Sequence, residues 1–162
     1  MSCGEKNKNT TSEKNQYDLE EKIIVELALT VLENDQFELY YKTRKEENYT
    51  SEKRVTYEVV GSKKKQTLQF VLDQGIYPYS IRLDFGRNQK QGEILVHELI
   101  MRYNQGTHVF DSQEIQKYFV PNKYVNFDFD TMTARTIVVD GKYDPYLASH
   151  NISKFVNRLI LY

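Results

Sequence analysis

The sequence predicts an all-β protein: a two-layer antiparallel β-sandwich of jelly-roll type with one short helix. The chain contains 13 tyrosines and 8 phenylalanines, and aromatic residues favour strands. Short stretches of alternating apolar and polar residues recur along the chain, separated by clusters of Gly, Asn and Asp. No long helical pattern intervenes between these stretches, so we expect successive strands to form antiparallel sheets.

Length and composition predict one domain preceded by a polar tail. The chain has 162 residues and a net charge of -1, which suits a single core and offers no basic surface for nucleic acid. Residues 4–16 contain no large apolar side chain, so burial there cannot offset the entropy cost of ordering. We therefore expect a disordered tether over residues 1–18 and a single β-sandwich domain over residues 19–162.

The first apolar segment, IIVELALTV at residues 23–31, fits two structures. A strand would align every second residue from Ile23 to Val31, whereas a helix would align Ile24 with Ala28. The β-branched residues of the segment favour the strand. A turn at Asn34 should then join it to the next strand as a hairpin.

Five further segments alternate between apolar and polar residues and are interpreted as strands. They are QFELYYK (36–42), RVTYEVV (54–60), TLQFVLD (67–73), YSIRLDFG (79–86) and YVNFDFD (124–130). The expected core is drawn from these segments, from residues 92–103 and from the C-terminal segment. Its members are Phe37, Leu39, Tyr57, Phe70, Ile81, Leu83, Ile94, Val96, Leu99, Phe127, Leu159 and Leu161.

One segment alternates with a change of phase. In GEILVHELIMRY (92–103) the apolar series moves by one position at His97 and Glu98. A β-bulge there would absorb the extra residue and keep both halves of the strand facing the core. A strand buried on both faces is the alternative.

A second segment carries a helix signal. In FDSQEIQKYFVPN (110–122), Asp111 and Glu114 have the spacing of an N-terminal capping box. Pro121 prevents the helix from continuing. We predict one short helix from Ser112 to Phe119.

The only cysteine, Cys3, directly precedes the polar tail. This arrangement resembles the mature start of a bacterial lipoprotein, in which the cysteine carries lipid and a linker holds the domain away from the membrane. The resemblance implies a cell-envelope location with lipid on Cys3 as the only membrane attachment. An apolar segment would then precede Cys3 in the full gene. A cytosolic protein with an incidental cysteine is the alternative.

The order of segments from Ile23 to Tyr146 resembles a family of jelly-roll sandwiches that occurs beside polysaccharide-handling proteins in bacteria. The likeness rests on DQFELYY (35–41), SIRLDFGRNQKQGEILVHELIM (80–101) and YDPYL (143–147). The last of these resembles a late Asp-Pro turn that precedes the closing strands of the family, which implies that the chain after it closes the sandwich as a strand. Phe85 stands where the family often has proline. These sandwiches resemble carbohydrate-binding modules, which implies a non-catalytic glycan-binding or accessory role. A structural subunit that contacts a protein partner is the first alternative, and a small glycan-active hydrolase is the second.

Tyrosines off the apolar faces or in loops are the candidate ligand-binding residues, because sugar binding uses exposed aromatic rings beside polar groups. They are Tyr40, Tyr49, Tyr77, Tyr143 and Tyr146. The chain contains no tryptophan, the side chain with the largest stacking surface, which weakens the case for sugar binding. Tyrosine in a strand is also commonly a packing residue with its hydroxyl at the surface.

Carboxylates supply the remaining candidates. Asp140 and Asp144 lie in the turn sequence VVDGKYDP (138–145), and oxygen ligands from such a turn could hold a structural calcium ion. The same residue types also form turns without metal. Asp128 and Asp130 alternate on one strand and could form a glycosidase pair, although half-exposed strands alternate in the same way. The sequence carries no nucleophile motif, so we expect neither enzymatic activity nor any cofactor besides calcium.

Arg82 and Asp84 occupy the polar face of SIRLDFG if Ile81 and Leu83 face the core. Same-face neighbours in a strand are about 7 Å apart, so the two charged side chains can meet. We predict that the loop ending in YDPYL (143–147) covers this pair. Arg82 is then a structural clamp that holds the loop, and not a ligand-binding residue.

Overall fold

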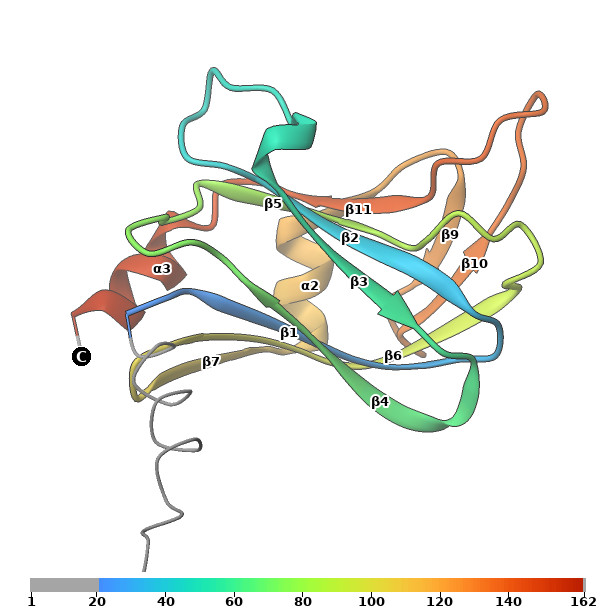
Figure 1. The fold of residues 1–162 in the computed structure, drawn as a ribbon, viewed down its shortest axis with the longest axis horizontal. Helices are drawn as coiled ribbons and strands as arrows, with labels where there is room; N and C mark the ends of the chain where they lie inside the picture. The colour runs from blue at the N-terminus through green and yellow to red at the C-terminus, as the bar shows by residue number, and fades with distance from the viewer. Residues whose placement is uncertain (1–20, 162) are drawn as a thin grey trace, which may run out of the picture.

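The computed structural model describes residues 21–161. Cys3 and the predicted tether over residues 1–18 lie outside the described residues. Two antiparallel sheets pack face to face, which confirms the predicted all-β sandwich (Figure 1). Within residues 21–161 no helix is long and apolar enough to cross a membrane.

The first layer is a six-stranded sheet with the order β4-β1-β6-β10-β9, in which β7 also pairs with β6. Its strands are β1 (Ile24–Val31), β4 (Ser62–Val71), β6 (Glu93–Tyr103), β7 (Gly106–Phe110), β9 (Val125–Asp128) and β10 (Thr133–Thr136). The second layer is a five-stranded sheet with the order β3-β2-β5-β11-β8. Its strands are β2 (Asp35–Lys42), β3 (Arg54–Val59), β5 (Ser80–Asp84), β8 (Phe119–Pro121) and β11 (Tyr146–Ser149).

The strand interpretation of residues 23–31 is confirmed, and the hairpin after it is wrong. Alternate residues from Ile23 to Val31 are at most 2% exposed, as a strand with one core face requires. However, β1 pairs with β4 and β6, whereas β2 pairs with β3 and β5 in the other layer. The turn at Asn34 therefore crosses between the sheets. Alternation indicates which face of a strand is buried. Two consecutive strands show the same alternation whether they pair in one sheet or lie in opposite sheets, so the pattern cannot distinguish the two arrangements.

The predicted bulge at His97–Glu98 is present in β6. The register against β1 shifts by one residue there, and His97 is the residue left over. Val96 and Leu99 are 4% and 2% exposed, so the apolar side chains on both sides of the bulge still face the core. His97 is exposed, and its Nε2 lies 2.9 Å from the Thr30 hydroxyl.

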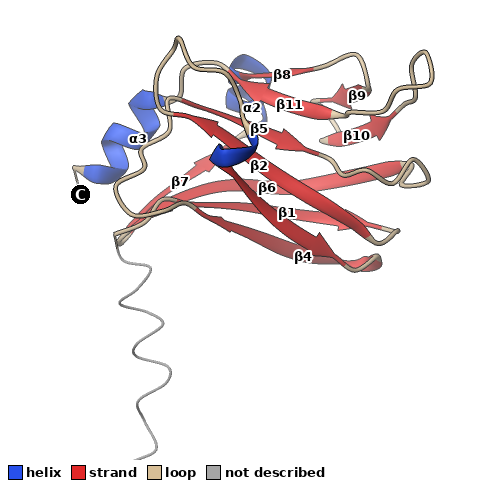
Figure 2. Ribbon diagram, turned by 45° about the horizontal axis from the view of Figure 1, so that its top comes forward, coloured by secondary structure: helices blue, strands red, loops and turns tan. Residues whose placement is uncertain are grey.

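The structure has two α-helices in residues 21–161, where the sequence analysis predicts one. The predicted helix is α2 (Ser112–Tyr118), which begins where the Asp111 carboxylate accepts the backbone N–H of Glu114 at 2.8 Å. It connects β7 of one sheet to β8 of the other (Figure 2). A single 3₁₀ turn, η1 (Ser51–Lys53), precedes β3.

The second helix, α3 (Ser153–Ile160), replaces the expected closing strand. Leu159 is 3% exposed, as predicted, but Leu161 is 85% exposed and does not belong to the core. Residues two apart share a face in a strand and lie on opposite sides of a helix. The sequence predicts Leu161 in the core because it would share a strand face with Leu159. In a helix it lies on the opposite side, so both the strand and the burial of Leu161 are wrong.

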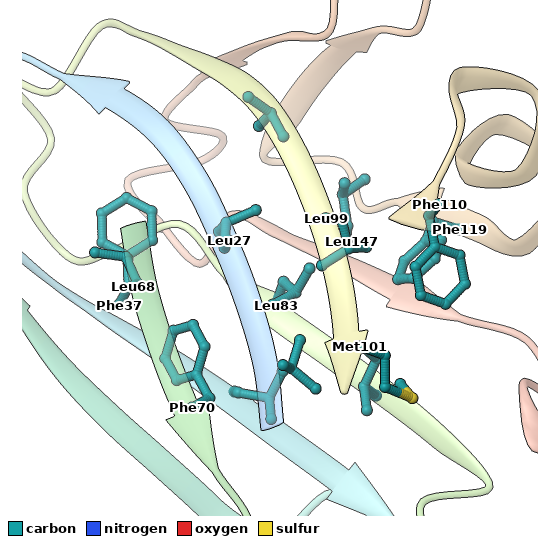
Figure 3. Close-up of a cluster of buried hydrophobic side chains, with 14 of the residues drawn as sticks. Leu27, Phe37, Leu68, Phe70, Leu83, Leu99, Met101, Phe110, Phe119 and Leu147 are labelled. Atoms are coloured by element: carbon teal, nitrogen blue, oxygen red, sulfur yellow. The ribbon is translucent and has the colours of Figure 1, made fainter. Parts of the chain in front are cut away.

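The core lies between the two sheets. Figure 3 shows Leu27, Leu68, Phe70 and Leu99 of the six-stranded sheet beside Phe37, Leu83 and Leu147 of the five-stranded sheet. Of the predicted core residues, Tyr57 and Phe127 are only partly buried. Both lie on edge strands, β3 and β9, where one side of the side chain has no neighbouring strand.

Candidate functional site on the outer face of the five-stranded sheet

The outer face of the five-stranded sheet carries a cluster of charged and aromatic residues. Core side chains alternate with outward side chains in β2 and β5, and this alternation turns Glu38, Tyr40, Arg82 and Asp84 away from the core. The register places Glu38 opposite Asp84 and Tyr40 opposite Arg82. We call the following residues the outer-face cluster: Glu38, Tyr40, Arg54, Arg82, Asp84, Arg87 and Tyr146.

Arg82 lies at the centre of this cluster. Its Nε and Nη2 donate to the two carboxylate oxygens of Asp84 at 2.7 and 2.6 Å. Nη2 also donates to Asp144 Oδ1 at 3.1 Å. The guanidinium carbon is 3.9 Å from the ring centroid of Tyr146 and 5.1 Å from that of Tyr40. The Arg82–Asp84 pair is thus formed and contacts the segment that leads into β11, while the clamp role of Arg82 stays a prediction.

Asp84 is a buried carboxylate despite its place on the outer face, since it is only 6% exposed. Burial raises the pKa of Asp84 to about 6, and the hydrogen bonds and charge of Arg82 oppose the rise only in part. The neighbouring carboxylates of Asp144 and Glu38 push the pKa of Asp84 further upward. The group therefore changes charge close to neutral pH.

Glu38 is the second buried carboxylate, 5% exposed, and two guanidinium groups contact it. Its Oε1 lies 3.1 Å from Arg54 Nη1 and 2.9 Å from Arg87 Nη2. The Tyr40 hydroxyl donates to Oε2 at 3.1 Å and accepts from Arg54 Nη1 at 3.2 Å. The carboxylate is therefore covered by two arginines and one phenol.

The loop between β5 and β6 brings Arg87 to the cluster, and Asp35 holds the start of that loop. The Asp35 carboxylate is 9% exposed and accepts the backbone N–H of Arg87 at 2.7 Å. It also accepts the backbone N–H of Asn88 at 3.2 Å and the side-chain amide of Gln91 at 3.1 Å. These bonds satisfy an otherwise costly buried charge and fix the first turn of the loop.

Three of the five tyrosines named from the sequence lie on this face. Tyr40 and Tyr146 flank Arg82, and the Tyr49 hydroxyl donates to the Ile81 carbonyl of β5 at 3.1 Å. Burial raises the pKa of Tyr49 above its ordinary value.

The other two tyrosines lie elsewhere. The Tyr143 hydroxyl donates to the Asn88 carbonyl at 3.1 Å, in the loops beside the β10–β11 connection. Tyr77 packs against Tyr103 of β6 with ring centroids 6.0 Å apart. Neither side chain makes a hydrogen bond or a ring interaction with the outer-face cluster in the part of the chain that the structure describes.

The aspartates named from the sequence take part in local structure. Asp140 is exposed in a turn with φ 51°, and Asp144 is paired with Arg82. Asp128 accepts the backbone N–H groups of Asp130 and Thr131 at 2.9 and 3.0 Å, as a turn-forming residue does. Across residues 21–161 no group of three or more His, Cys, Asp or Glu is placed to hold a metal ion. The calcium prediction therefore rests on the sequence alone.

Glu38, Arg54 and Arg87 belong to the cluster and were not named from the sequence. Glu38 stands at a polar position of the alternating segment QFELYYK, which marks it as outward-facing. Its encounter with Arg54 and Arg87 depends on β2 lying between β3 and β5. The alternating pattern within a single strand does not indicate this order of strands.

Comparison of the chain with protein-family models, with curated proteins and with solved structures gave no match. The resemblance to jelly-roll sandwiches beside polysaccharide-handling proteins and the lipoprotein resemblance therefore remain predictions from the sequence.

Proposed function

We propose that the protein is a non-catalytic glycan-binding module of the cell envelope, and that the outer face of the five-stranded sheet is its binding face. The observation that supports this is the gathering of Tyr40, Tyr49 and Tyr146 around Arg82, among buried carboxylates. Sugar rings present apolar C–H faces and dense hydroxyl groups. Aromatic rings can stack on the C–H faces, and charged side chains can form hydrogen bonds with the hydroxyl groups.

The cluster suits binding better than it suits hydrolysis. Glycoside hydrolysis needs one carboxylic acid free to give up a proton to the leaving oxygen and a second free to attack or to activate water. Here Asp84 is held by both arms of Arg82, and Glu38 is covered by Arg54 and Arg87. Both carboxylates serve to orient arginine and tyrosine side chains.

The test is affinity gel electrophoresis of the purified domain in gels that contain single plant, algal or bacterial polysaccharides. At least one polysaccharide is expected to retard migration of the parent protein. Tyr146→Ala should abolish this retardation. Tyr77→Ala, which removes a 40% exposed tyrosine away from the cluster, is the matched control and should bind as the parent does. Equal retardation of Tyr146→Ala and the parent, with both variants folded by circular dichroism, contradicts the proposed face.

A protein partner is the second candidate. Val120 of β8 is 48% exposed and lies opposite Ala148 of β11 on the same sheet, so an apolar strip borders the charged cluster. Failure of every polysaccharide, together with loss of a protein complex in Val120→Asp, would favour this candidate.

The envelope location is a separate part of the proposal, with lipid carried on Cys3. Expression of the full gene in a bacterial host should place the protein in the membrane fraction, and Cys3→Ser should release it. Membrane association that survives Cys3→Ser contradicts the anchor without bearing on glycan binding.

A further inference from the structure

The part of the binding face around Glu38 presents an excess of exposed positive charge. Arg54 and Arg87 contact the same carboxylate oxygen at 3.1 and 2.9 Å. The Glu38 side chain is 6% exposed, whereas those of Arg54 and Arg87 are 34% and 65% exposed. A ligand that approaches this place meets two guanidinium groups, while the one carboxylate that balances them lies underneath.

Both arginines retain donors for a ligand. A guanidinium group carries five N–H donors. Among hydrogen bonds and ion pairs within residues 21–161, Arg54 uses only Nη1, toward Glu38 and Tyr40, and Arg87 uses only Nη2 of its side chain, toward Glu38. Because both groups are held to one oxygen, they are neighbours, and their remaining donors can converge on a single acceptor.

The rest of the face does not offer the same excess. Arg82 is shared between Asp84 and the Asp144 carboxylate, whose side chain is 56% exposed. Glu58 of β3 accepts from the side-chain amide of Gln36, which places a carboxylate on the far side of Glu38. At the Arg54–Arg87 pair, by contrast, two guanidinium groups share one carboxylate beside the Tyr40 hydroxyl.

We infer that the ligand is an acidic polysaccharide whose anionic group, a carboxylate or a sulfate, binds between Arg54 and Arg87. The neighbouring sugar rings lie along Tyr40 and Tyr146. This ligand class presupposes the proposed glycan-binding function and narrows it. A uronate offers a planar acceptor for bidentate guanidinium binding, and a sulfate ester offers three oxygens to the same donors.

The experiment measures binding by isothermal titration calorimetry to four probes: polygalacturonate, its fully methyl-esterified form, dextran sulfate and neutral dextran. The esterified polymer keeps the sugar backbone and removes the charge. Tighter binding of polygalacturonate than of its ester supports a carboxylate ligand, and tighter binding of dextran sulfate than of neutral dextran supports a sulfate ligand. Preference for neither anionic polymer over its uncharged counterpart overturns the inference.

Arginine variants locate the anion site. Arg87→Gln should weaken binding to the preferred anionic polymer by about tenfold, the effect of one lost charged hydrogen bond. Arg87 is 65% exposed, so this variant is expected to fold, and Arg54→Gln is the second variant. The control Arg135→Gln removes the same charge from a 53% exposed arginine on the other sheet and should leave affinity unchanged. Equal losses in Arg87→Gln and Arg135→Gln indicate general charge attraction and overturn the assigned site.

The outcomes distinguish the acidic-ligand inference from the underlying proposal of glycan binding. Binding of a neutral polysaccharide that requires Tyr146, without preference for an anion, contradicts the acidic ligand and leaves glycan binding intact. Absence of binding to every polysaccharide contradicts both. Binding of an anionic polymer that depends on Arg87 and not on Arg135 supports both.

Discussion

The carboxylate of Asp35 fills the space that a side chain at Gly86 would need. Gly86 has φ +87°, and a Cβ built there would collide with the Asp35 carboxyl group. The same carboxylate accepts the backbone N–H of Arg87. The absence of a side chain at Gly86 thus allows Asp35 to hold the loop that carries Arg87 into the outer-face cluster.

Gly86→Ala is expected to destabilise the protein by about 2 kcal/mol or more, because a left-handed backbone strain of about 1–2 kcal/mol adds to a steric collision. Urea denaturation followed by circular dichroism measures the loss. Gly92→Ala is the matched control: Gly92 also has positive φ, +69°, but nothing lies within 4 Å of its Cβ position. Equal losses of unfolding free energy in the two variants would show that the Asp35 carboxylate moves away from the new methyl group without destabilising the protein.

Arg82→Ala is expected to lower the free energy of unfolding at pH 7 by about 3 kcal/mol, because it leaves the buried Asp84 without its partner. Thermal unfolding measures this loss. The control Arg135→Ala breaks an exposed pair with Glu93, 53% and 62% exposed, and should change stability by about 0–1 kcal/mol. An Arg82→Ala variant that melts like the parent would contradict the clamp role of Arg82.

The Arg82–Asp84 pair could be predicted from the sequence because both partners belong to one strand. Alternation in SIRLDFG fixes which side chains share a face, and no knowledge of neighbouring strands is needed. The meeting of Glu38 with Arg54 and Arg87 required the order β3-β2-β5. The same missing information explains the wrong hairpin between β1 and β2. Alternation indicates the buried face of each strand, but it does not indicate which strand each one pairs with.

The C-terminal helix α3 is not predictable from the sequence for a different reason. Phe155, Val156 and Leu159 are at most 3% exposed and have the three- and four-residue spacing of a helix. Leu159 and Leu161 also have the two-residue spacing of a strand, and in so short a segment both periods fit. Contacts with β7 decide between them, since Phe155 packs on Phe110 with ring centroids 4.9 Å apart.

Phe155→Ala is expected to lower the free energy of unfolding by about 3–5 kcal/mol, the usual cost of removing a buried aromatic ring. The ring also lies 4.4 Å from the His108 ring and 5.1 Å from that of Tyr118, so α2, α3 and β7 lose contacts together. Leu161→Ala is the control within the same segment, and its 85% exposed side chain predicts little change. A large loss of unfolding free energy in Leu161→Ala would instead favour the predicted closing strand over α3.

The last prediction concerns the pH dependence that Asp84 gives to stability. Two effects oppose one another at this carboxylate: burial raises its pKa, and the Arg82 guanidinium lowers it. Burial is the larger, which brings the pKa from the ordinary 3.8 to about 6 in the folded protein. Below pH 6 the folded state therefore binds a proton that the unfolded state does not bind until pH 3.8.

Asp84 should consequently favour folding as the pH falls. Its contribution is fully present below pH 3.8 and is lost as the pH rises through about 6. Relative to Asp84→Asn, which cannot titrate, the parent should gain up to about 3 kcal/mol in free energy of unfolding between pH 7 and pH 4. Urea denaturation of both proteins across this range measures the difference, and carbon NMR of the Asp84 carboxyl gives the midpoint directly. An ion pair that outweighed burial would depress the pKa below 3.8 and reverse the sign. A parent that loses stability relative to Asp84→Asn as the pH falls would therefore show that Arg82, and not burial, governs this carboxylate.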